Sequence, residues 1–163
     1  MSIKIIITGG IIDDLDYQKI EDAPKEHKSY IPDLIKQMKI NLDYQIDDLM
    51  AIDSKFITDQ ERKIIAKRCL GCQEDRIIIT HGTATMSTTA KYLGQKKIPK
   101  TIVLTGAVIP VNKKGSDGPL NLRAALSVVQ TLPPGVYIAM NGSIFNWDNV
   151  SKNLKTGFFE KEN

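Results

Sequence analysis

The chain has 163 residues, of which 42% are hydrophobic and 25% are charged, as in an average soluble globular domain. Its 22 basic and 19 acidic residues leave a formal net charge of +3 without any block of like charges, so nothing indicates a nucleic-acid partner. No apolar run approaches the roughly 20 residues of a membrane span, and no charged leader precedes the first apolar run. We therefore expect one cytoplasmic domain, residues 1–163, without membrane attachment.

Short apolar runs alternate along the chain with segments of helical period, a pattern typical of a parallel sheet that is covered by helices on both faces. The predicted strands are residues 3–8, 42–49, 76–80, 101–105 and 136–140. The second of them alternates more in polarity, which favours an edge position. The predicted helices are residues 30–40, a segment beginning at 58–61, 85–93 and 120–132. These elements predict a three-layer α/β fold.

Residues at the helix starts support these assignments. Ser29 can serve as the N-cap of the first helix, with Pro32 in its first turn. Thr58 and Glu61 have the spacing of a capping box, in which each side chain accepts an otherwise unpaired backbone N–H. Residues 115–119 are rich in glycine, serine and proline, and we expect them to form a turn before the fourth helix.

Two segments are predicted to be mobile. Residues 15–28 are polar, contain Pro24 and follow the first strand directly, where open α/β sheets place their ligand loops. We expect this segment to be a flexible active-site loop. The tail, residues 158–163, is expected to fray.

The two cysteines, Cys69 and Cys72, form a lone C-x-x-C pair. A zinc site of this type needs a second pair of cysteines or histidines, which the sequence lacks. We therefore expect neither a metal nor another cofactor.

Glycines and hydroxyls follow three of the predicted strands, in residues 8–12, 80–85 and 105–110. Ligands of such sheets bind at the carboxyl ends of the strands, so these segments are the candidate site. A single glycine after a strand is more often a turn residue than part of a ligand site. None of the segments has the spacing of a dinucleotide or phosphate loop, so we do not expect a nucleotide.

Together with two later segments, these motifs resemble the amino-terminal domain of the bacterial L-asparaginases. The matching segments are T-G-G at 8–10, I-T-H-G-T-x-T-M at 79–86, V-L-T-G-A-x-x-P at 103–110, S-D-G-P-x-N-L at 116–122 and M-N-G-x-x-F…K at 140–152. The resemblance runs from Lys4 to about Lys152 and is closest to short, single-domain asparaginase-like bacterial proteins, through residues 133–142.

This resemblance implies a flavodoxin-like sheet and the hydrolysis of L-asparagine to L-aspartate and ammonia. In the full-length enzymes a second domain completes the active site across a dimer interface. The resemblance therefore also implies a homodimer, and a ligand such as asparagine, aspartate or a similar small molecule.

The family mechanism uses two threonines, an aspartate and a lysine. Thr83 corresponds to the second threonine and Lys152 to the lysine. The first threonine is replaced by Ile11 and the aspartate by Ala84, so two catalytic positions are substituted. Without its carboxylate partner, a buried Lys152 would lose its proton more easily and could then act as a base for Thr83.

The resemblance also implies substrate-binding residues, namely Gly10, Tyr17, Ser54 and Gly82. His81 is expected to be structural, because no acid or nucleophile stands at a spacing that would support catalysis. Three readings remain open: an asparaginase-like protein with weak or absent activity, an amidohydrolase that uses a Thr83–Lys152 dyad on another amide, and a non-catalytic module that binds small amino acids.

Overall fold

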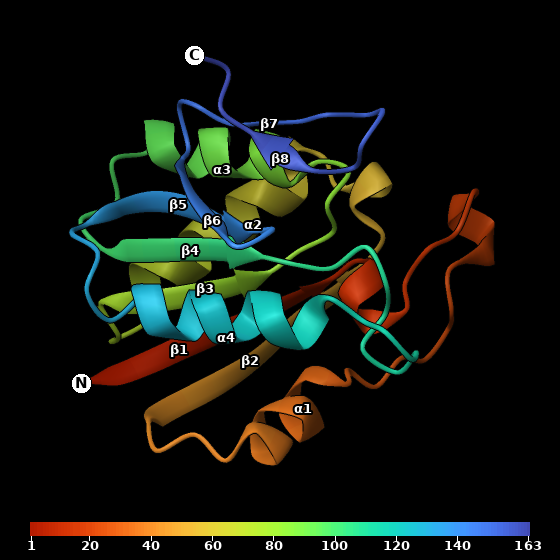
Figure 1. Cartoon of the computed structure of the whole chain (residues 1–163), viewed down its shortest axis with the longest axis horizontal. Helices are drawn as coiled ribbons and strands as arrows, with labels where there is room; N and C mark the ends of the chain where they lie inside the picture. Colours follow the sequence, from red (N-terminus) through yellow and green to blue (C-terminus); the bar gives the residue numbers. More distant parts are fainter.

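A central sheet of six strands, in the order β2-β1-β3-β4-β5-β6, organises the computed structural model, which describes residues 1–163 (Figure 1). The strands are β1 (Ser2–Gly9), β2 (Asp43–Ile52), β3 (Arg76–Thr80), β4 (Thr101–Thr105), β5 (Gly135–Met140) and β6 (Ser143–Asn146). The first five are parallel, and β6 pairs antiparallel with β5. This is the flavodoxin-like order, so the predicted fold class is confirmed, as is the edge position of the second strand.

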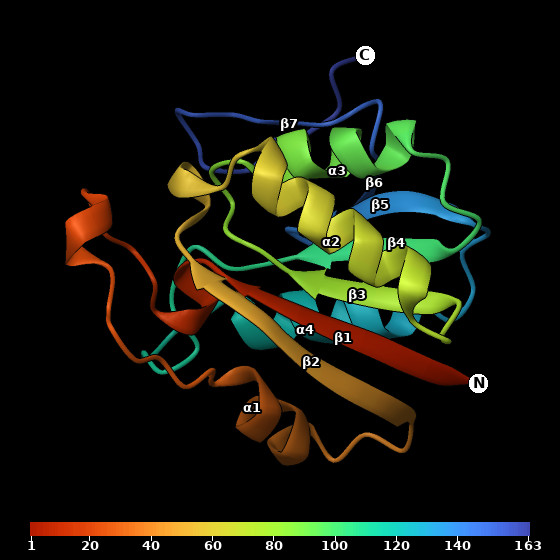
Figure 2. The ribbon, with the colours of Figure 1, turned by 180° about the vertical axis from the view of Figure 1, so that it is seen from behind.

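Helices cover both faces of the sheet, with α1 (Ile31–Met38) and α4 (Gly118–Val128) on one face and α2 (Asp59–Gly71) and α3 (Met86–Gln95) on the other. Figure 1 has α4 in front of the sheet, and Figure 2 has α2 in front of it from the opposite side. Alternation along each strand sorts the apolar side chains between two cores. In β1, Ile5 and Ile7 pack with α1 and α4, whereas Ile6 packs with α2 and α3. The apolar runs read from the sequence are therefore strands buried on both faces.

The starts of the helices differ in part from the sequence prediction. The capping box of Thr58 and Glu61 is confirmed. The N-cap of α1 is Tyr30 rather than Ser29, although the Ser29 hydroxyl still accepts the Ile31 N–H at 3.1 Å. Helix α4 begins at Gly118, two residues before the predicted start, because Pro119 fits the first turn of a helix, where no N–H is needed.

The carboxyl-terminal part contains three strands that the sequence analysis missed: β6 and the short pair β7 (Ser151–Lys152) and β8 (Phe159–Glu160). The expectation of a fraying tail is wrong for Phe159, which is buried in the core with α2 and α3. Its backbone N–H also donates to the Asn141 side chain at 2.9 Å. Strands of two residues have too little periodicity to be recognised in a sequence.

The chain reverses its direction of winding next to β1, because β2 lies on one side of β1 and β3 on the other. Such a reversal opens a crevice at the carboxyl ends of the two central strands. The Thr8 hydroxyl donates to the Thr80 carbonyl at 2.7 Å and ties these two ends together. The loops that follow β1, β2 and β3 consequently meet at one place.

The long connection from β1 to α1 is fastened at its two ends by Asp13. This fully buried carboxylate accepts the Ser29 hydroxyl at 2.6 Å and the Tyr30 N–H at 2.7 Å. Burial raises the pKa of Asp13 above its ordinary value. The intervening residues include two short helical turns, η1 (Ile11–Asp13) at the start and η2 (Ile20–Asp22) further out. The predicted flexibility of residues 15–28 stays a prediction.

We expect Asp13→Asn to keep both contacts, since an amide accepts the Tyr30 N–H and donates to Ser29, and to remove the cost of a buried charge. A raised folded-state pKa means that the stability contributed by Asp13 is complete at low pH and is lost as the pH rises through that pKa. The asparagine variant should therefore gain stability over the wild type at pH 7 and lose this advantage near pH 4. Asp13→Ala, which removes both contacts, should cost about 1–3 kcal/mol near pH 4 and less at pH 7, where the wild type carries the buried charge. Urea unfolding measures both effects, and equal losses in the two variants would contradict the argument.

Candidate active site

A cavity of about 130 Å³ lies at the carboxyl ends of β1 and β3. Its walls are formed by Gly10, Ile11, Asp16, Asp53, Ser54, Lys55, Gly82, Thr83, Ala84 and Lys152. Seven of the eight positions singled out in the sequence are therefore brought together, the exception being Tyr17. They come from the three loops after β1, β2 and β3 and from β7. Ile11 and Ala84, for which the resemblance implies substituted catalytic positions, line the same cavity as Thr83 and Lys152.

Two glycines allow these loops to approach closely. Gly10 has φ of +85°, a conformation that favours glycine, and a Cβ there would overlap the backbone of Gly82. A Cβ on Gly82 would lie 2.6 Å from Ser54 Cβ. The backbones after β1 and β3 and the η3 turn (Ser54–Phe56) after β2 are thus packed with no side chain between them. The shape of the cavity depends on this contact.

Thr83 and Lys152 form a direct pair in the cavity wall. Lys152 Nζ donates to Thr83 Oγ1 at 2.9 Å, although the two residues lie 69 positions apart in the sequence. None of the five ion pairs of the structure involves Lys152. Burial lowers the pKa of Lys152 below its ordinary value, because a desolvated ammonium without a carboxylate partner is disfavoured. A neutral amine beside a hydroxyl can accept its proton.

The β7–β8 ribbon holds Lys152 in place. Lys152 pairs with Phe159 across the two strands. Val150 and Phe159 are both buried in the core with α2 and α3. The amine at the end of a long side chain is therefore carried by a segment that the core anchors on both sides.

A second amine, that of Lys55, lines the same cavity in a very different environment. Lys55 Nζ lies 3.0 Å from Asp16 Oδ1 and 3.2 Å from Asp53 Oδ2. The hydrogen bond with Asp16 raises the pKa of Lys55 and keeps this amine charged. The sequence analysis did not identify Lys55, Asp16 or Asp53 as residues of the site. The one feature of the sequence that could have indicated two of them is that Asp53 and Lys55 flank Ser54.

Tyr17 lies next to the cavity rather than in its wall. Its N–H donates to Asp53 Oδ2 at 3.0 Å, and its hydroxyl accepts the Asp53 N–H at 3.1 Å. Its ring stacks on Phe56, with the centroids 5.2 Å apart. Leu15 and Tyr17 are both buried, so the first part of the predicted loop is packed against the turn after β2.

His81 is completely buried directly behind the cavity. Its Nδ1 donates to the Gly82 carbonyl at 2.7 Å, and its Nε2 accepts the Thr89 hydroxyl at 2.8 Å. Thr89 in turn accepts an N–H from Arg62 at 3.0 Å. Burial lowers the pKa of His81 to about 4, so the ring is neutral at pH 7. This chain of hydrogen bonds holds the Gly82 turn, in agreement with the structural role expected for His81.

Comparison with known proteins identifies the family. Residues 2–159 match the family description "Asparaginase, N-terminal". The chain belongs to the asparaginase family. A protein of Haemophilus influenzae described as a probable periplasmic L-asparaginase is 33% identical over 164 residues, which cover 95% of this chain and 47% of that protein.

Solved structures of the asparaginase family have the same fold. The thermostable L-asparaginase from Thermococcus kodakarensis matches with a TM-score of 0.81 and 29% identity, covering 99% of this chain and 51% of that one. A probable cytoplasmic L-asparaginase from Campylobacter jejuni matches with a TM-score of 0.82 and 32% identity, covering 98% and 52%. The chain thus spans about half the length of these relatives. None of its helices has the length and hydrophobicity to cross a bilayer.

Two of the five asparaginase motifs are used to build a loop of the domain. In the segment after β4, the Asp117 carboxylate accepts the backbone N–H groups of Val108 and Ile109 at 3.0–3.1 Å. The Asn121 side chain donates to the Gly106 carbonyl at 2.9 Å. The motifs at 103–110 and 116–122 therefore bind each other, and none of their residues lines the cavity.

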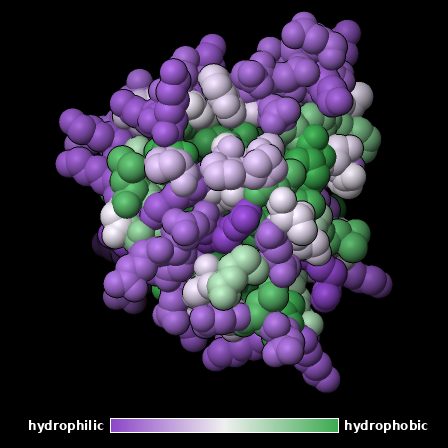
Figure 3. Space-filling view, turned by 90° about the vertical axis from the view of Figure 1, so that its left-hand side faces the viewer, coloured by the Kyte–Doolittle hydropathy of each residue, from purple (hydrophilic) through white to green (hydrophobic).

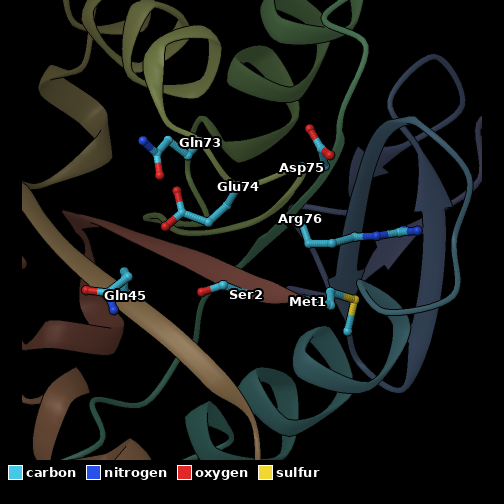
Figure 4. Close-up of a pocket in the computed structure, with 7 residues that line it drawn as sticks. All are labelled: Met1, Ser2, Gln45, Gln73, Glu74, Asp75 and Arg76. Carbon is cyan, nitrogen blue, oxygen red and sulfur yellow. The ribbon is translucent and has the colours of Figure 1, made fainter.

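A larger pocket of about 660 Å³ lies at the opposite end of the strands, where β1 and β3 begin. It is lined by Met1, Ser2, Gln45, Gln73, Glu74, Asp75 and Arg76, and Figure 4 shows Arg76 pointing away from Glu74 and Gln45. The surrounding face is mostly hydrophilic, with separate apolar patches (Figure 3). The five residues of β3 separate this pocket from the Gly82 turn by roughly 15 Å.

Gly82→Ala tests the close packing around the cavity. The new methyl group would overlap Ser54, so we expect a loss of about 1–3 kcal/mol in the free energy of unfolding. Gly71→Ala, at the end of α2, is the matched control, because a Cβ there meets nothing within 4 Å. The control should be neutral or up to about 1 kcal/mol more stable. Denaturant unfolding of both variants measures the difference, and equal stabilities would contradict the packing argument.

Proposed function

We propose that this asparaginase-family domain binds asparagine, aspartate or a similar small molecule in the cavity and hydrolyses L-asparagine weakly or not at all. The observation that carries the proposal is the composition of the cavity. Of the four catalytic groups that the resemblance implies, it has a hydroxyl at Thr83 and an amine at Lys152, and hydrocarbon side chains at positions 11 and 84. By resemblance, those two positions hold a nucleophilic threonine and an aspartate in active asparaginases.

The size of the expected defect follows from these two losses. Removing the nucleophile of a hydroxyl-based relay costs about 10⁴- to 10⁶-fold in turnover, and removing the acid of the relay costs a comparable amount or somewhat less. The two effects are not additive, because both groups serve the same step. Binding depends on the glycine turns and Ser54, which are retained, and is therefore expected to survive the loss of catalysis.

The first test is ammonia release from L-asparagine. The wild-type chain should release ammonia far more slowly than about 1 s⁻¹, the lower end of typical turnover numbers. Ile11→Thr combined with Ala84→Asp should increase the rate, because the variant restores a hydroxyl and a carboxylate to the cavity. Thermal unfolding with and without aspartate shows whether both proteins are folded and bind. Wild-type turnover at or above about 1 s⁻¹ would overturn the proposal. A folded, aspartate-binding double variant without any gain would show that the side chains at positions 11 and 84 are not the sole defect.

A second candidate function is hydrolysis of a different amide by Thr83 and Lys152 alone. The 2.9 Å contact and the lowered pKa of the amine favour it. In this mechanism the neutral amine of Lys152 takes the Thr83 proton as Oγ1 attacks the amide carbon. The protonated amine then donates to the leaving nitrogen, and water hydrolyses the resulting ester.

Substitutions of Thr83 separate the two candidates. If the dyad acts, Thr83→Val abolishes turnover of a small amide and Thr83→Ser retains part of it. The rate should also rise with pH as Lys152 loses its proton, and level off below the ordinary lysine pKa of 10.5. Ammonia release from a panel of small amides measures these effects. An unchanged rate in Thr83→Val would remove Thr83 from the mechanism.

The homodimer and the cytoplasmic location remain predictions. The dimer is expected from the resemblance to the full-length enzymes. The relatives in the comparison include proteins described as periplasmic and as cytoplasmic, so the family does not decide the compartment. Sedimentation of the purified chain measures the oligomeric state.

A further inference from the structure

The two amines of the cavity differ in every property that controls their reactivity. Lys55 is held by two carboxylates. Lys152 has no acidic partner, and the hydroxyl of Thr83 is the only acceptor of its hydrogen bonds. Ile11 and Ala84, which line the same small cavity, offer hydrocarbon surface and no charge. Lys55 is therefore kept charged by its two ion pairs, whereas the surroundings of Lys152 favour its neutral form.

A neutral amine is a nucleophile, whereas an ammonium is not. Each unit by which a lysine pKa falls increases the fraction of free amine at neutral pH about tenfold. Proteins form bonds between lysine and carbonyl carbon atoms where the amine is shielded from water and lacks a counter-ion. Lys152 is half-buried and takes part in no ion pair. The hydrogen bond to Thr83 fixes the amine at the cavity wall, so a carbonyl compound in the cavity meets it directly.

We propose that Lys152 is a carbonyl-reactive lysine that forms a reversible imine with small 2-oxo acids. The lone pair of Nζ attacks the carbonyl carbon, and a proton moves from nitrogen to the carbonyl oxygen, which gives a carbinolamine. Loss of the hydroxyl group together with a second amine proton releases one water molecule and leaves a carbon–nitrogen double bond. Thr83, whose oxygen already contacts Nζ, can relay this proton, because its hydroxyl donates to the departing hydroxyl group and takes the second amine proton in return. The reaction requires no oxidant or reductant and is independent of amide hydrolysis.

The size and polarity of the cavity select the class of compound. Its volume of about 130 Å³ corresponds to roughly four water molecules at ~30 Å³ each, which suits a carbonyl compound of two to four carbons.

The backbone N–H groups of Gly82, Thr83 and Ala84 donate to no acceptor within the protein. They can receive a carboxylate. The acidic residues of the cavity, Asp16 and Asp53, are both paired with Lys55. They therefore repel a bound carboxylate less strongly than unpaired carboxylates would.

Reductive trapping tests this proposal on the intact chain. The protein is incubated at pH 7 with glyoxylate and sodium cyanoborohydride, which converts an imine into a stable secondary amine. Peptide mass spectrometry then gives the rate of labelling at each lysine. We expect Lys152 to be labelled about tenfold or more faster than Lys55 and than Lys63, which is exposed on α2. Equal labelling of the three lysines, or no labelling of Lys152, would overturn the proposal.

Two controls address folding and the ligand class. Lys152→Arg should lose the fast label, whereas Lys63→Arg should keep it. The wild-type peptide map gives the answer even if the Lys152→Arg variant does not fold.

Acetaldehyde replaces glyoxylate in a parallel experiment, because it has the same carbon number and lacks the carboxylate. The ratio of Lys152 to Lys63 labelling should be larger with glyoxylate, and equal ratios would overturn the preference for 2-oxo acids. Ammonia release from asparagine is measured separately, so failure of imine formation does not affect the proposed function.

Discussion

The close contact between the backbones of Gly10 and Gly82 is the constraint on which the cavity depends. It lets the turn after β1 lie directly against the turn after β3, with Ser54 packed on the other side of Gly82. The strand order places these turns at the reversal next to β1, and the buried chain from Arg62 through Thr89 to His81 holds the Gly82 carbonyl. Larger residues would push the loops apart and remove the geometry that Thr83 and Lys152 share.

The electrostatics of the cavity follow from which acids are present and where. Asp16 and Asp53 both pair with Lys55, and neither pairs with Lys152. At position 84, where the family resemblance implies an acid, the side chain is a methyl group. The cavity therefore contains a compensated ion-pair cluster at Lys55 and an uncompensated amine at Lys152. Lys152 is therefore the amine of the cavity that is favoured to accept a proton or to attack as a nucleophile, because the carboxylates hold Lys55 in its charged form.

The sequence was sufficient for the parts of the fold that have a long or repeated signal. Continuous apolar runs predict β1, β3, β4 and β5 because strands buried on both faces need them, and the capping box at Thr58 predicts the start of α2. The β7–β8 ribbon could not be predicted, because two-residue strands have no periodicity and the burial of Phe159 arises only from tertiary packing. The cluster of Asp16, Asp53 and Lys55 was missed for a related reason. Charged residues in loops are usually solvated, and only the folded chain brings these three together.

Ile11 and Ala84 act on Lys152 in the same direction, because neither side chain can stabilise the charged form of the amine. An acid at position 84 would stabilise the ammonium form and keep the lysine inert toward carbonyl groups. A hydroxyl at position 11 would make the cavity more polar and reduce the desolvation of the amine. With hydrocarbon at both positions, neither side chain offers Lys152 an acidic partner, and burial lowers the pKa of this amine, which contacts Thr83. The two side chains that the resemblance marks as replacements of catalytic residues are thus also the ones that leave Lys152 without a charged partner.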